Sequence, residues 1–126
     1  MLRSAWTPGP AGLDGQVLVS VTAFTGDHLY DLPRIYRAGT RLARLWPTLE
    51  GAVGHWLWME PTRRRSGSVS LWTSPRAMRD FVGLPVHVQI MREFRRRGTV
   101  RSTTWTVDDP VLRDTWRRAA EFLATG

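Results

Sequence analysis

The sequence predicts an α+β fold in which the elements follow one another as β-α-β-β-α-β, with one more helix at the C-terminus. Three observations support this prediction. Short runs of β-branched and aromatic residues indicate four strands, and apolar residues spaced three and four apart indicate the helices between them. Finally, the order of elements is that of a split βαβ unit, which builds a four-stranded antiparallel sheet with helices on one face.

The first half of the chain supplies an arm, a strand and a helix. Residues 1–15 are rich in proline and glycine without a period, so we expect a loose arm followed by a single domain over residues 16–126. Residues 17–24, VLVSVTAF, predict a strand. From Leu29 the spacing becomes helical up to Pro47, with an apolar stripe of Leu32, Ile35, Tyr36, Gly39, Leu42, Ala43 and Trp46.

A hairpin comes next. Residues 51–61 and 68–74 alternate as strands, and the polar turn TRRRSG joins them. Ser74 and Pro75 then form a typical helix start, because serine can cap the helix and proline suits its first position.

The second half of the chain continues with helices and a strand. A short helix over residues 75–82 ends at Gly83, and Pro85 begins a second one. Its apolar stripe is His87, Ile90, Met91 and Phe94, while arginines occupy the other sides until Gly98. Residues 99–107 predict the fourth strand. Asp109 and Pro110 are expected to cap and open the last helix, with a stripe of Leu112, Trp116, Ala119, Ala120 and Leu123.

Both faces of the predicted sheet are apolar. Trp56 and Trp58 lie on the opposite face from His55 and Leu57, and Trp72 lies opposite its neighbour Leu71. Such a sheet must be covered on both sides, and the chain has few helices left to do so. We therefore expect a homodimer in which two sheets close into a barrel.

Composition excludes several kinds of chemistry. The chain has no cysteine and no lysine, which excludes disulfides, thiolate nucleophiles and lysine Schiff bases. All 18 basic residues are arginine and give a net charge of +7, but they recur in every polar segment, so we expect no nucleic-acid partner. The N-terminus has no signal-peptide core and no apolar run could span a bilayer, so the expected location is cytoplasmic, with no membrane partner.

The segment SVSLWTSPRAMRDFVGLPVHVQIMREFRRRG, residues 68–98, resembles the dimeric α/β-barrel (ferredoxin-like) superfamily. It is most similar to the antibiotic-biosynthesis-monooxygenase and spheroidene-monooxygenase-like groups, and the resemblance in element order covers residues 17–107. It implies a homodimeric enzyme that oxygenates an aromatic substrate without a cofactor. Trp72 matches the strand tryptophan of the cofactor-free monooxygenases and Arg92 their arginine, whereas Ser68 and Met78 stand where those enzymes have an amide and a tyrosine.

The haem-degrading branch of the superfamily fits less well. Phe81 lies near the position of its helix tryptophan, and Met91 lies near that of its iron-ligating histidine, one turn after His87. A bound haem stays an alternative. No other metal site is expected, because the three histidines lack any metal-ligand spacing.

These considerations give a candidate site between the sheet and the helices. His87 would be a catalytic base, since its pKa lies near neutrality, and Arg92 a catalytic anion stabiliser. Trp72 and Trp105 would form the walls, with His55, Met91 and Phe94 as further substrate-binding residues.

We expect a small monooxygenase-like enzyme of specialised metabolism that acts on an apolar or aromatic molecule. A cyclase, isomerase or dehydratase could use the same residues by proton transfer. A haem- or hydrophobic-ligand-binding protein without catalysis is the third alternative.

Overall fold

A computed structural model describes residues 1–125 of the chain. Four long strands form the centre of the molecule: β3 (Gln16–Gly26), β4 (Ala52–Glu60), β5 (Arg65–Trp72) and β6 (Gly98–Asp108). They lie in the order β4-β5-β3-β6, and every neighbouring pair is antiparallel. This is the ferredoxin-like arrangement, and it confirms the predicted fold class.

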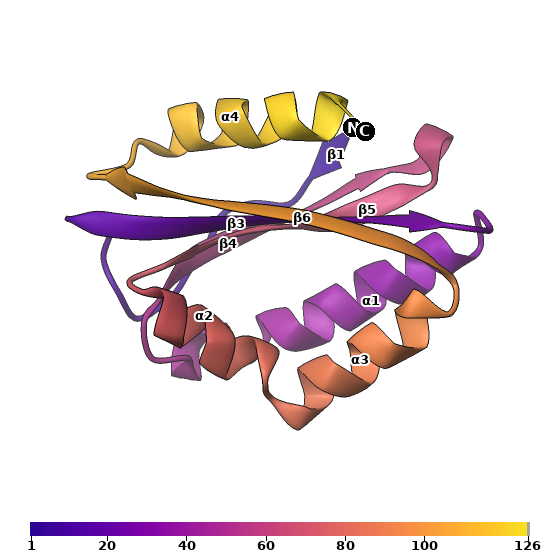
Figure 1. The fold of residues 1–126 in the computed structure, drawn as a ribbon, viewed down its shortest axis with the longest axis horizontal. Coiled ribbons are helices and arrows are strands. Elements are labelled where there is room, and N and C mark those ends of the chain that lie inside the picture. Colours follow the sequence, from indigo (N-terminus) through magenta and orange to yellow (C-terminus); the bar gives the residue numbers. More distant parts are fainter. Residues whose placement is uncertain (126) are drawn as a thin grey trace.

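Helices lie on both sides of the sheet (Figure 1). One face carries α1 (Asp31–Ala43), α2 (Pro75–Val82) and α3 (Pro85–Arg95), while α4 (Leu112–Ala124) lies on the other. Short 3-10 turns, η1 (Trp46–Thr48) and η2 (Pro61–Arg63), precede and follow β4. The predicted break at Gly83 is confirmed, because α2 ends there and α3 begins at Pro85.

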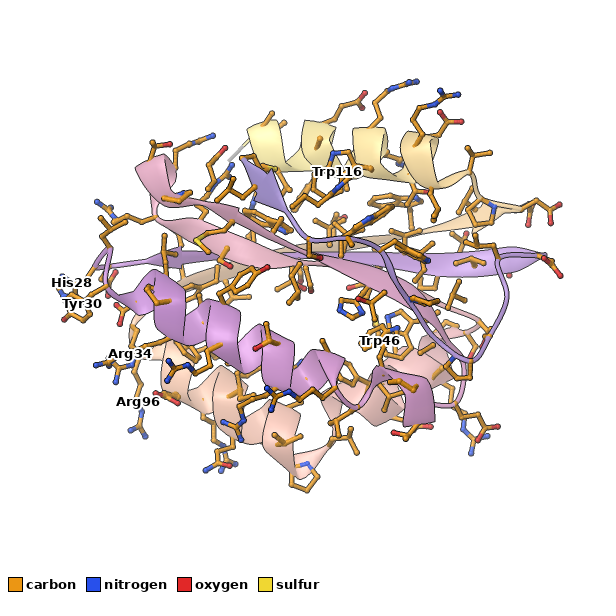
Figure 2. All side chains as sticks on the ribbon, turned by 180° about the vertical axis from the view of Figure 1, so that it is seen from behind. His28, Tyr30, Arg34, Trp46, Arg96 and Trp116 are labelled. Carbon is orange, nitrogen blue, oxygen red and sulfur yellow. The ribbon has the colours of Figure 1, made fainter. Side chains whose placement is uncertain are left out.

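The second face of the sheet is covered within the chain, which corrects the argument that led us to expect a dimer. Fully buried valines of β3 and β5, together with Leu71 of β5, pack against Ala119 and Leu123 of α4 and against Trp56 and Trp58 of β4. Trp116 lies between α4 and the sheet (Figure 2). One amphipathic helix of thirteen residues is enough to complete the cover of this face, because the N-terminal arm covers part of it.

The arm is not loose, contrary to our expectation. Its two short strands, β1 (Leu2–Arg3) and β2 (Thr7–Pro8), pair with β4 and widen the sheet. Trp6 packs edge-on against Trp56 with ring centroids 4.6 Å apart, over a Gly54 whose lack of a side chain leaves room for the indole. The arm thus protects the edge of β4, which would otherwise expose unpaired backbone groups.

The ends of two helices test the capping predictions. The Ser74 hydroxyl accepts a hydrogen bond from the Ala77 N–H at 3.2 Å, as expected of a cap. Asp109 does not cap α4: it has a positive φ of 47°, and its carboxylate accepts a 2.7 Å hydrogen bond from the Gly15 N–H. Asp109 therefore ties the start of β3 to the end of β6 instead.

Replacing Leu123 by alanine is expected to destabilise the fold by about 2–5 kcal/mol, the usual cost of truncating a fully buried leucine. Glu121→Ala on the exposed side of α4 is the matched control and should change little. Urea unfolding at constant m-value measures both. If Leu123→Ala were no more costly than Glu121→Ala, α4 would not be docked on the sheet in solution.

Candidate functional site

A cavity of about 120 Å³ lies between the sheet and the pair of helices α1 and α3. It is comparable in size to cavities that hold a single aromatic ring. Four of the predicted site residues line it, namely His55, His87, Met91 and Phe94. Much of the remaining wall is apolar, and it includes Phe24, Ile35, Leu42, Trp46, Leu57, Phe81 and Ile90.

The sheet side of the cavity follows from strand alternation. On β5, the side chains of Ser66, Ser68 and Ser70 point to the cavity face, whereas Val69 and Leu71 point to α4. Three small serines in alternation leave space where larger residues would fill the core. The prediction from sequence missed these serines, although the pattern SGSVS carried the signal.

The helix side is opened by a glycine. Gly39 of α1 faces Leu57 of β4 so closely that an added Cβ would lie 3.3 Å from a Leu57 methyl group. Tyr36, one turn earlier on α1, and Trp46 of η1 also line the cavity. The sequence placed all three on the apolar stripe of a helix but not in a site.

His55 is deeply buried at the end of the cavity near Trp46. Its side chain is only 3% exposed, and its ring centroid lies 4.3 Å from that of Trp46 (Figure 2 labels Trp46 beneath the sheet). Burial away from water lowers the pKa of His55 to about 4. The imidazole is therefore neutral at pH 7.

His87 lies on α3 at the same cavity, half-buried, with its ring edge-on to Phe81 at 4.9 Å. Burial is the main cause of a pKa below its usual value, and the positive charge of Arg95 acts in the same direction. The backbone of Val82 acts in the opposite direction and raises the pKa of His87 in part. Nδ1 of His87 is nevertheless buried without a hydrogen-bond partner in this structure. His87 is thus also a neutral base at pH 7.

Both imidazoles leave the same nitrogen unpartnered. Nδ1 of His55 and of His87 is buried without a hydrogen bond, and so is the indole Nε1 of Trp46. With no partner on Nδ1 to fix the tautomer, Nε2 of each ring can serve as acceptor or as donor.

Trp72 supports the cavity from behind rather than lining it. It is fully buried against Trp46 and Phe81, with centroids 4.9 and 5.2 Å away, and its Nε1 donates a 3.0 Å hydrogen bond to the Ser70 hydroxyl. That bond orients one of the serines of the cavity. Trp72 was predicted as a wall of the site, but it contacts three residues that line the cavity and does not line the cavity itself.

Trp105 and Arg92 lie outside the cavity, and both predictions are corrected. Trp105 is opposite Val19 in the strand register, so it faces α4, where the Arg118 guanidinium lies 4.5 Å from its ring. Arg92 is exposed on the outer side of α3. It is five residues from His87, which on a helix turns it away from the stripe that faces the sheet.

No group of three or more histidine or acidic residues that could hold a metal ion occurs within residues 1–125. A haem, with its four pyrrole rings, would need several times the space of a one-ring cavity. In the same part of the chain, no helix is long and apolar enough to cross a membrane.

Comparison with solved structures agrees on the fold. The chain has the ferredoxin-like α+β fold. SnoaB from Streptomyces nogalater, described as a cofactor-independent oxygenase, matches with a TM-score of 0.57 at 19% identity, over 77% of this chain and 97% of its own. A dimeric ferredoxin-like protein of unknown function from Jannaschia sp. CCS1 has a TM-score of 0.62 at 16% identity, over 72% and 99% of the two chains.

A further neighbour has no stated activity. Protein SO0527 from Shewanella oneidensis has a TM-score of 0.66 at 13% identity and covers 75% of this chain and 93% of its own. No protein-family model and no curated protein matches the sequence. At these identities the likeness establishes the fold and leaves the reaction to the site itself.

The lowered pKa of His55 predicts a specific loss of stability in acid. The unfolded chain binds a proton near pH 6.5 and the folded chain only near pH 4, so stability from this group is present above pH 6.5 and lost as the pH falls towards 4. The loss amounts to about 3 kcal/mol at pH 4. Urea unfolding of the wild type and of His55→Gln at pH 7 and pH 4 measures it, because only the wild type should lose this amount. Equal losses would contradict a buried neutral His55.

Proposed function

We propose that the chain is a small monooxygenase-like enzyme that oxidises an apolar or aromatic molecule in the cavity. The single observation that carries this proposal is a mostly apolar cavity of one-ring size that contains two neutral imidazoles. The similarity of fold to SnoaB, a protein described as a cofactor-independent oxygenase, supports the reaction class.

His87 would take the proton from a carbon next to a phenol or carbonyl group. The resulting carbanion is resonance-stabilised and can itself reduce O₂, first by one electron and then by radical recombination to a carbon-bound peroxide. Loss of water from that peroxide leaves a ketone, so that R₂CH₂ and O₂ give R₂C=O and H₂O. The balance needs no reductant other than the substrate.

The experiment is a screen of one-ring phenols with an unsubstituted para carbon, which match the size of the cavity, for O₂ uptake coupled to a product that gains one oxygen atom and loses two hydrogens. Met91→Trp is the matched variant, because a larger side chain from α3 should fill the cavity and abolish uptake while the protein stays folded. Proton exchange at the same carbon without O₂ uptake would instead favour an isomerase or cyclase. Uptake that Met91→Trp leaves unchanged would place the reaction outside the cavity.

We propose that the chain forms a homodimer. The support comes from one structural neighbour and not from an uncovered apolar face. The Jannaschia neighbour is described as dimeric, but the apolar face that suggested a dimer is covered by α4. Light scattering at micromolar concentration is expected to give twice the 14.4 kDa mass of one chain. A mass of 14.4 kDa would mean that α4 takes the place of a partner.

A further inference from the structure

The outer face of α1 and α3 is strongly basic. We call it the α1/α3 surface. Seven exposed arginines lie on these helices or within one residue of their ends: Arg34, Arg37, Arg41, Arg44, Arg92, Arg95 and Arg96. The same stretches contain only two carboxylates, the buried Asp31 and the exposed Glu93. Folding therefore gathers on one face arginines that look dispersed in the sequence.

These seven cations have no carboxylate partner. Within residues 1–125, none of them has a carboxylate oxygen within 4.0 Å, and both nearby carboxylates instead contact Arg97, at 3.3 Å for Asp31 and 3.8 Å for Glu93. Like charges held together without counter-charges repel one another and create a positive potential. An anionic partner would relieve that repulsion.

A groove on this surface shares two lining residues with the cavity. It is lined by three arginines and one carboxylate, Arg34, Arg37, Arg41 and Glu93, together with the apolar Ile90 and Phe94. Ile90 and Phe94 are also part of the cavity wall. The side chains of Ile90 and Phe94 therefore lie between the groove and the proposed substrate site.

Apolar anchors stand beside the arginines. Leu29 and Tyr30, at the start of α1, are 58% and 59% exposed, and the Arg34 guanidinium lies 5.8 Å from the Tyr30 ring. Figure 2 shows Tyr30, Arg34 and Arg96 at the same end of the molecule. Exposed tyrosine and arginine around an apolar residue are typical of protein interfaces, whereas phosphate backbone contacts would not require an exposed leucine.

We propose that the α1/α3 surface docks an acidic protein that delivers a ligand to the cavity. The docking is inferred from the charge, the groove and the exposed anchors, and only the delivery rests on the proposed function. The partner would bring a carboxylate-rich surface over Arg37 and Arg41 and place its cargo above Ile90 and Phe94.

The test measures binding of an acidic acyl carrier protein, labelled with a fluorophore, by anisotropy at low salt. Arg37→Glu/Arg41→Glu is expected to weaken binding by on the order of tenfold or more, since opposite charges now repel. Arg113→Glu/Arg117→Glu on α4 is the matched control, because it reverses the same number of exposed charges on the other side of the molecule. It should weaken binding much less.

Three outcomes would overturn the inference: no binding of the carrier protein by the wild type, equal weakening by the two double variants, or tighter binding of a DNA duplex than of the carrier. The readout does not involve turnover. If the carrier binds as expected but no oxygenase activity is found, the docking surface stands and the proposed reaction fails.

Discussion

Replacing His87 by alanine is expected to lower turnover by about 10²- to 10⁴-fold, the usual contribution of a positioned general base. The physical reason is that His87 lines the cavity and that burial keeps it neutral at pH 7, so it can accept a proton there. The measurement is kcat for O₂ uptake with the best substrate of the screen. In the wild type, kcat should fall as the pH drops through the lowered pKa of His87.

The matched control for this prediction is His28→Ala. His28 is exposed in the loop before α1 and stacks on Tyr30 at 4.9 Å, away from the cavity, so its loss should leave kcat for a free small molecule nearly unchanged. Circular dichroism must show that His87→Ala is folded. A folded His87→Ala variant with full activity would remove His87 from the mechanism and leave His55 as the candidate base.

Replacing Trp72 by alanine is expected to destabilise the protein by about 3–5 kcal/mol, because the indole is fully buried and its removal leaves a large void. The loss should also affect the site, since Trp72 packs against Trp46 and holds the Ser70 hydroxyl. Chemical denaturation measures the first effect and ligand affinity the second.

Two comparisons separate these contributions. Trp72→Phe keeps most of the ring but lacks the N–H, so it should cost less stability while still freeing Ser70. Trp105→Ala removes the other predicted wall, but from the α4 face, and it should leave ligand affinity unchanged. A larger loss of affinity for Trp105→Ala than for Trp72→Ala would mean that the ligand binds on the α4 side of the sheet.

The sequence determined the four long strands, the main helices and their order, because these depend on local chemistry. Two-residue alternation fixes which strand residues share a face, so the pattern alone correctly separates His55 from Trp56. Helical spacing likewise places His87, Met91 and Phe94 on the stripe of α3 that lines the cavity. Serine and proline at the start of α2 specify its first turn.

Only the tertiary structure decided which face of the sheet each helix covers. Alternation shows which neighbours share a face with Trp72 and which share a face with Trp105. It does not show that the two tryptophans lie on opposite faces of the sheet, because their relative placement depends on the register of β6 against β3. The choice of α4 as the cover for the second face has the same origin. The sequence of an amphipathic helix shows which stripe is buried but not which face of the sheet covers that stripe. The arm has no residue period that would predict its pairing with β4.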